Sequence, residues 1–109
     1  MKSQTGYYAV IFSAKRSADD NGYGEMASKM ETLAKTMPGY LGFEAACNPD
    51  GFEIAVSYWE TEEDIAHWKH HQDHLEAQRR GQLDWYEFYD VRVAKVERAY
   101  NKTTKPGDN

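Results

Sequence analysis

Cysteine is almost absent from this 109-residue chain. Cys47 stands alone, so no intrachain disulfide can form. Long apolar runs are absent as well: none approaches the roughly 20 residues that span a bilayer. The polar start of the chain, MKSQTGYYAV, is unlike a signal peptide. These absences predict a cytoplasmic protein in a reducing compartment, with no membrane partner.

Positive charge is also scarce. There are 13 Lys and Arg against 18 Asp and Glu, which gives a net charge of -5, and no basic block interrupts the sequence. Because nucleic-acid binding begins with the neutralisation of phosphates, this balance excludes nucleic acid as an expected partner. Aromatic residues, by contrast, reach 14%, and eight of them are tyrosines, which suit pockets and interfaces. The length fits one small domain, for which oligomerisation would add buried surface.

The apolar pattern predicts six elements. A β-branched and aromatic stretch at 7–15 is typical of a central strand covered on both sides. Apolar residues at helical spacing follow, until Pro38-Gly39 stops them. Two alternating stretches around the turn Asn48-Pro49-Asp50-Gly51 indicate a β-hairpin. The expected order is a strand at 7–15, a helix at 23–37, strands at 40–47 and 52–59, a helix at 61–80 and a strand at 85–98.

The second helix carries clear end signals. Thr61 is a suitable N-cap, and the three acidic residues after it would lie at the positive end of the helix dipole. Gly81 should end the helix. The adjacent His70-His71 leads us to expect a break within it.

The order β-α-β-β-α-β predicts an α+β, ferredoxin-like domain with a four-stranded antiparallel sheet and both helices on one face. The domain would cover residues 7–100, between a flexible start at 1–6 and a disordered tail at 101–109. Two features favour a homodimer. The other sheet face would be left open, and the last strand exceeds the usual length of about 5–6 residues, so part of it would stay unpaired.

Particular motifs carry a family resemblance. The stretch 57–68, SYWETEEDIAHW, resembles the antibiotic biosynthesis monooxygenase family, in which a strand ending in Trp-Glu leads into a helix with a second Trp. The resemblance extends over about 7–100, because four further stretches also match the family: the helix continuation at 69–78, Pro38-Gly39-Tyr40, Trp85-Tyr86 and the final-strand motif at 91–94. It implies a dimeric α+β barrel. It also implies a cofactor-independent monooxygenase for a small phenolic or polycyclic aromatic, or else a non-catalytic small-molecule-binding or stress-associated dimer.

The same resemblance places Trp68 against a cavity between the helices and the sheet. We expect Trp68 to form the wall of that cavity. We expect His74 to act as the general base of the reaction, since imidazole titrates near neutrality. Tyr86, Tyr89 and Arg92, near or on the last strand, are expected to bind an oxygenated aromatic substrate. For each of these residues, a purely structural use is the competing interpretation.

Metal and haem are two further possibilities that the histidines raise. His67, His70, His71 and His74 contain two i, i+4 pairs that could bind a metal, but no nearby cysteine completes a set, so no metal site is predicted. Haem-degrading relatives use an Asn on strand one, a helix Trp, and a His about three turns after that Trp. Trp68 matches, but Gln78 stands at the His position and strand one has no Asn. No cofactor is therefore expected, and haem binding is the weakest alternative.

Overall fold

The computed structural model describes residues 6–17, 23–78 and 86–102, and for residues 72–78 it describes the backbone. In chain order the elements are β1 (Tyr7–Arg16), α1 (Tyr23–Ala34), β2 (Tyr40–Cys47), β3 (Phe52–Trp59), α2 (Glu62–Gln78) and β4 (Tyr86–Val96). The predicted order is confirmed. The predicted flexible start and disordered tail fall mostly outside the described residues, as do Trp85 and the expected helix end at Arg79 to Gly81.

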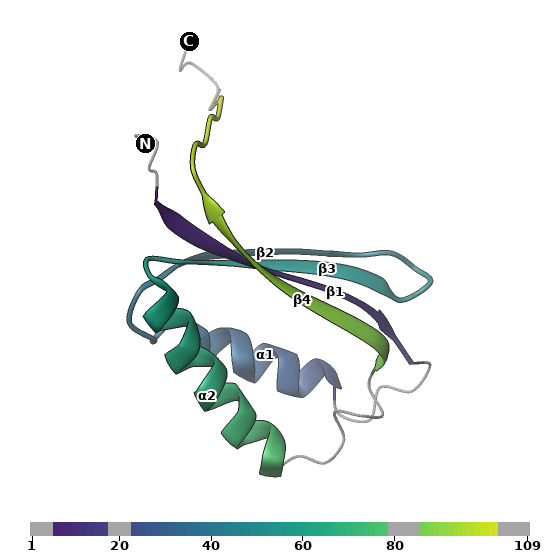
Figure 1. Ribbon diagram of the computed structural model, residues 1–109. Coiled ribbons are helices and arrows are strands. Elements are labelled where there is room, and N and C mark those ends of the chain that lie inside the picture. The colour runs from purple at the N-terminus through teal and green to yellow at the C-terminus, as the bar shows by residue number, and fades with distance from the viewer. Residues whose placement is uncertain (1–5, 18–22, 79–85, 103–109) are drawn as a thin grey trace, which may run out of the picture.

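The four strands form one antiparallel sheet in the order β2-β3-β1-β4. This is the ferredoxin-like arrangement, with β1 in the centre as predicted, and Figure 1 shows α1 and α2 on the same side of the sheet. Directly paired residues share a face, and successive residues alternate. Because Val10 packs against the core between the sheet and the helices, its face is called the helix face, and the opposite face is called the open face.

The hairpin between β2 and β3 follows from its turn residues. The Asn48 N–H donates to the Phe52 carbonyl at 2.8 Å, and the Gly51 N–H donates to the Asn48 carbonyl at 3.0 Å. Gly51 has a φ of 95°, which a side chain would disfavour. Asp50 Oδ1 accepts from the Phe52 N–H at 3.0 Å. These local bonds hold the turn of the β-hairpin that the sequence predicted.

The first helix ends at Ala34, earlier than the predicted Met37. Beyond Ala34 the hydrogen bonds tighten to the i→i−3 type, from Thr36 to Leu33 and from Met37 to Ala34, each at 3.0 Å. Pro38 disfavours a helical conformation in the residue before it, so the chain leaves the helix before the proline. The apolar stripe nevertheless continues to Met37, which packs on the core from this turn.

The second helix is capped as predicted but is not broken. Thr61 Oγ1 accepts from the Asp64 N–H at 3.0 Å and donates to the Asp64 carboxylate at 2.8 Å. From Glu62 the helix continues without interruption to Gln78. The expected break at His70-His71 is therefore wrong. Adjacent histidines lower helix propensity only slightly, and neither Gly nor Pro occurs in this stretch.

The last strand does not leave an unpaired half within the protomer. Residues Tyr86 to Val96 pair with Arg16 to Tyr7 along the full length of β1, with one irregularity at Lys15/Arg16. One of the two sequence arguments for a homodimer is therefore wrong, because β1 is itself long enough to pair with β4. The other argument, the open face, stands.

The protomer has a small core under one face of the sheet. Among the described residues, the buried hydrophobic side chains on the side of the helices are Ala14, Met26, Ala34, Trp59 and Trp68, while the small Ala9 is buried on the open face. Three of these, Ala34, Trp59 and Trp68, form a cluster that joins α1, β3 and α2. The helices therefore cover one face, and within the protomer the expectation that β1 is covered on both sides is not met. Neither described helix is long and apolar enough to cross a membrane.

Candidate functional site

A column of stacked rings occupies the space between α2 and the sheet. Trp68 stacks on Trp59 with ring centroids 5.9 Å apart, and His71 stacks on the other side of Trp68 at 6.2 Å. Tyr40 meets Trp59 edge-on at 5.7 Å. The Trp59 indole N–H donates to Ser57 Oγ at 2.9 Å, so its polar atom is satisfied inside the core. The column leads from the buried core outward along α2 to an imidazole.

A second group of rings lies on the helix face of β1 and β4. Phe12 stacks on Tyr89 with centroids 5.6 Å apart and meets Tyr86 edge-on at 5.3 Å. Tyr86 and Tyr89 also contact each other edge-on at 5.8 Å. Phe12, Tyr86 and Tyr89 are called the aromatic floor from here on. Its two phenol groups add polar atoms to an apolar surface, a combination that suits a phenolic ligand.

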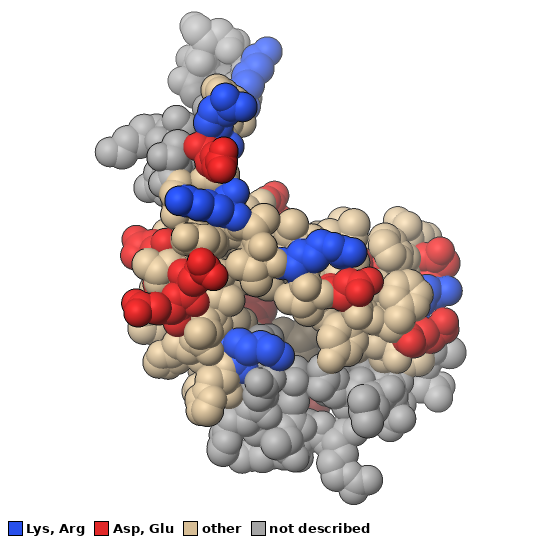
Figure 2. All heavy atoms as spheres, in the orientation of Figure 1, with Lys and Arg blue, Asp and Glu red and all other residues tan. Residues whose placement is uncertain are grey.

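The aromatic floor adjoins the ring column. Val10 packs against the Trp59 and Trp68 cluster, and Phe12 follows two residues later on the same face of β1, about 7 Å further along the strand. Val93 and Val91, which pair with Val10 and Phe12, are each 50% exposed although they lie on the helix face. The helices therefore leave this end of the sheet uncovered. Figure 2 shows a hollow beneath the sheet, in the part of the molecule where Figure 1 places the space between β4 and α2.

The structure brings some of the predicted site residues together and separates others. Trp68 is 7% exposed and belongs to the core column. Tyr86 and Tyr89 share the aromatic floor. Arg92 pairs with Ile11 and therefore lies on the open face, opposite to Tyr89. The side chain of His74 lies outside the described residues, so its role as a base stays a prediction.

His71 is the residue that the sequence pattern did not single out. It is half-buried and covers Trp68, whereas His67 and His70 are exposed. The signal was present in the spacing: His71 follows Trp68 by three residues, and residues three apart are neighbours on a helix face. From the sequence we instead expected His74 to act as the base.

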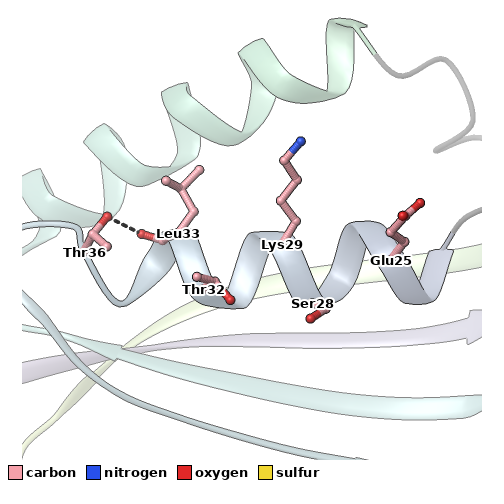
Figure 3. Close-up of a pocket in the computed structure, with 6 residues that line it drawn as sticks. All are labelled: Glu25, Ser28, Lys29, Thr32, Leu33 and Thr36. Carbon is pink, nitrogen blue, oxygen red and sulfur yellow. Dashed lines mark hydrogen bonds between the residues drawn. The ribbon is translucent and has the colours of Figure 1, made fainter.

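A groove lies along α1, and one of its lining residues, Leu33, also packs against the Trp59 and Trp68 cluster. It has a volume of about 580 Å³ and is lined by Glu25, Ser28, Lys29, Thr32, Leu33 and Thr36. Figure 3 shows Lys29 and Leu33 directed toward the side on which α2 lies. Thr36 donates its hydroxyl to the Leu33 carbonyl at 2.7 Å. The groove is open and holds none of the aromatic rings, so the aromatic floor is the better candidate for binding an aromatic molecule.

Among the described side chains, no three His, Cys, Asp or Glu residues come close enough together to bind a metal ion. Tyr58, on the open face, has a raised pKa. The Tyr58 hydroxyl donates to Glu44 Oε2 at 2.8 Å. This hydrogen bond, together with burial and the charge of Glu44, raises the pKa of Tyr58 to about 12. Tyr58 and the aromatic floor are on opposite faces of the sheet.

Comparisons with known proteins agree with this architecture. The profile of the family described as antibiotic biosynthesis monooxygenase matches residues 10–80. The uncharacterized protein YqjZ of Bacillus subtilis (strain 168) is 52% identical over 92 residues, which are 84% of this chain and 81% of that protein.

Two solved structures show the same fold at low identity. SnoaB from Streptomyces nogalater, a cofactor-independent oxygenase, superposes with a TM-score of 0.69 at 7% identity, over 89% of this chain and 99% of that one. A conserved protein from Methanosarcina mazei Go1 superposes with a TM-score of 0.72 at 6% identity, over 85% of this chain and 95% of that one. At such identities the likeness extends to the fold alone.

Proposed function

This chain belongs to the antibiotic biosynthesis monooxygenase family, and on that premise we propose that it is a cofactor-independent monooxygenase for a small phenolic or polycyclic aromatic substrate. The aromatic floor is the observation that carries the proposal. The rings of Phe12 and Tyr89 stack on each other, and the ring of Tyr86 meets Phe12 edge-on. A planar aromatic molecule fits such a surface better than an aliphatic one, because its rings can stack and its oxygens can meet the tyrosine hydroxyls.

The exposure of the aromatic floor supports binding at this place. Tyr89 is 47% exposed on the helix face, where residues of a sheet are normally covered by the helices. Val91 and Val93 extend the uncovered apolar surface along β4. A ligand between this surface and α2 would bury these side chains and exclude water from its own reactive carbon.

The proposed reaction needs a substrate that supplies its own electrons. A base removes a proton from an activated ring CH₂ group, and the resulting anion gives one electron to O₂. The two radicals combine to a hydroperoxide, and the loss of water leaves a carbonyl group. The CH₂ group and O₂ thus become C=O and H₂O, and the proton taken by the base leaves with the water. The protein contributes the base, the orientation of the ring and a site shielded from water.

We propose His74 of α2 as the base and His71 as the ring that positions Trp68. Both residues lie on α2, whose Trp68 stacks in the ring column. Imidazole is the side chain best matched to proton removal near neutral pH. Trp68 lies between His71 and the core, so it fixes the position of this part of α2 against the sheet. Tyr86 and Tyr89 would hold the oxygen atoms of the substrate.

Oxygen uptake with anthrone as the substrate tests the proposal. The wild-type protein is expected to consume one O₂ per ketone formed, and His74→Ala to lower kcat by about 10²–10⁴-fold with little change in KM. His67→Ala is the matched control, because His67 is an exposed histidine of the same helix. If His71→Ala alone abolishes turnover, the base is His71. Anthrone binding without oxygen uptake would support the non-catalytic alternative.

A further inference from the structure

The two helices diverge, and the groove along α1 opens toward the gap between them. Figures 1 and 3 show α1 and α2 close together where α1 ends and α2 begins, and further apart toward the start of α1 and the end of α2. Lys29 and Leu33, two of the lining residues, point toward α2. The groove volume of about 580 Å³ falls within the roughly 300–1,000 Å³ of small-molecule sites. Because Leu33 also packs against the Trp59 and Trp68 cluster, the groove begins beside the ring column.

Lys29 supplies the positive charge of this groove. It is the one cation among the described lining residues, and Figure 3 shows its side chain extended from α1 toward α2. Glu25 precedes it by four residues, a spacing at which opposite charges on a helix commonly pair. Glu31 and Lys35, which have the same spacing on α1, do pair, with Oε2 and Nζ 3.8 Å apart. Among the described residues Lys29 forms no such pair, so its ammonium group is directed into the groove and not to a carboxylate of its own helix.

The groove and the aromatic floor adjoin the same core cluster. Leu33 of α1 and Val10 of β1 both pack against that cluster. Lys29 lies four residues before Leu33, about 6 Å along α1, and Phe12 lies two residues after Val10, about 7 Å along β1. Both steps lead toward the same end of the molecule, because Figure 1 shows the start of α1 at the end of the sheet where β1 ends. A molecule that stacks on the aromatic floor can therefore extend an arm toward Lys29.

We propose that the substrate is an acidic aromatic molecule, whose rings stack on the aromatic floor and whose carboxylate arm enters the groove and binds the Lys29 ammonium group. This inference rests on the proposed function and names the substrate class of the same site. The three residues of the floor provide rings and hydroxyl groups but no charge, whereas the groove provides a cation but no ring. The two surfaces are therefore complementary to one molecule with an aromatic end and an anionic end. A cationic arm would be repelled by Lys29, and a neutral arm would gain no ion pair from it.

Two matched ligands test the proposal through the quenching of tryptophan fluorescence: anthraquinone carboxylate and its neutral counterpart, hydroxymethyl anthraquinone. The wild-type protein is expected to bind the carboxylate about 5–10-fold more tightly than the alcohol at low salt, and the preference should shrink in high salt because Lys29 is exposed to solvent. Lys29→Met keeps the length of the side chain without its charge and should abolish the preference, while Lys29→Arg should retain it. Lys35→Met is the matched control, because Lys35 pairs with Glu31 and does not line the groove.

A variant of the aromatic floor shows whether one molecule contacts both surfaces. Tyr89→Ala should weaken both ligands by the same factor and leave the preference for the carboxylate unchanged. Equal affinity of the wild-type protein for the two ligands, or a preference that survives in Lys29→Met, would overturn the proposal, as would an unchanged affinity of Tyr89→Ala for the carboxylate. The proposed reaction is tested separately, because these quinones have no CH₂ group to oxidise. A carboxylate preference without oxygen uptake from anthrone would remove the monooxygenase and keep the acidic ligand, and oxygen uptake without the preference would remove the acidic ligand alone.

Discussion

Tyr58 and Glu44 form a pair whose protonation can be followed directly. The folded protein holds the Tyr58 proton more tightly than an unfolded chain, since the pKa rises from 10.0 to about 12 through the Glu44 carboxylate and burial. The unfolded chain therefore loses this proton first as the pH rises. The contribution of the pair to stability is full below about pH 10 and is lost between pH 10 and pH 12.

We therefore expect Tyr58→Phe to remove part of the decline in unfolding free energy over that interval, as measured by urea unfolding at several pH values. Ultraviolet titration of tyrosinate should show one fewer late-ionising tyrosine in this variant. Tyr8→Phe, on the helix face of β1, serves as the control. An unchanged titration curve for Tyr58→Phe would show that this tyrosine ionises normally.

Trp68 has a structural and a proposed binding role that can be separated. The ring is almost fully buried between Trp59 and His71, so Trp68→Ala should cost about 3–5 kcal/mol of unfolding free energy. Trp68→Phe keeps a stacked ring and should cost much less. If Trp68 also forms the wall of the site, Trp68→Phe should raise the KM for anthrone while the protein stays folded. A normal KM in this variant would confine Trp68 to the core.

At the scale of the element, the start of α2 is fixed by a few atoms. Thr61 caps the helix, and the Glu60 N–H donates to the Gly39 carbonyl at 2.9 Å, which ties the start of α2 to the start of β2. A side chain at Gly39 would overlap the Asp64 carboxylate, and the φ of 81° there favours glycine. Gly39 is thus required for the close approach of the N-terminal ends of α2 and β2.

Thr61→Ala should lower the unfolding free energy by about 1 kcal/mol, because the Asp64 N–H loses its acceptor. Thr61→Ser keeps the hydroxyl and should stay within a few tenths of a kcal/mol of the wild type. Thermal or urea unfolding measures both variants. Equal losses in the two would mean that the methyl group of Thr61, and not its hydrogen bond, stabilises this end of the helix.

At the scale of the whole molecule, we expect that the protein does not bind haem. Strand one, from Tyr7 to Arg16, contains no Asn, and Gln78 occupies the position where haem-degrading relatives carry their iron ligand. Titration of haem into the protein should therefore leave the Soret band essentially as it is in free haem. Stoichiometric binding followed by ring opening with a reductant would contradict this expectation and would favour His71 or His74 as a displaced ligand.

Much of the fold could be predicted from local chemistry. The hairpin bounds at 40–47 and 52–59 were correct, because alternation and the Asn48–Gly51 turn specify them within the segment itself. The N-cap at Thr61 was correct for the same reason. The end of α1 and the continuity of α2 were mispredicted. The helix α1 ends before Met37 because Pro38 disfavours a helical conformation in the residue before it. The helix α2 continues through His70-His71 because the low helix propensity of histidine is too small an effect to interrupt a helix.

The sequence by itself determined the element order, the family and the presence of an apolar sheet face, because periodicity, turn residues and motifs are local properties. Only the tertiary structure decided which side chains share a face and a neighbourhood. The register of β4 against β1 places Tyr86 and Tyr89 with Phe12 but puts Arg92 on the other side, and it aligns Arg92 with Glu44 across the sheet. A shift of one residue in that pairing would exchange the two faces, and strand sequence alone does not fix such a register.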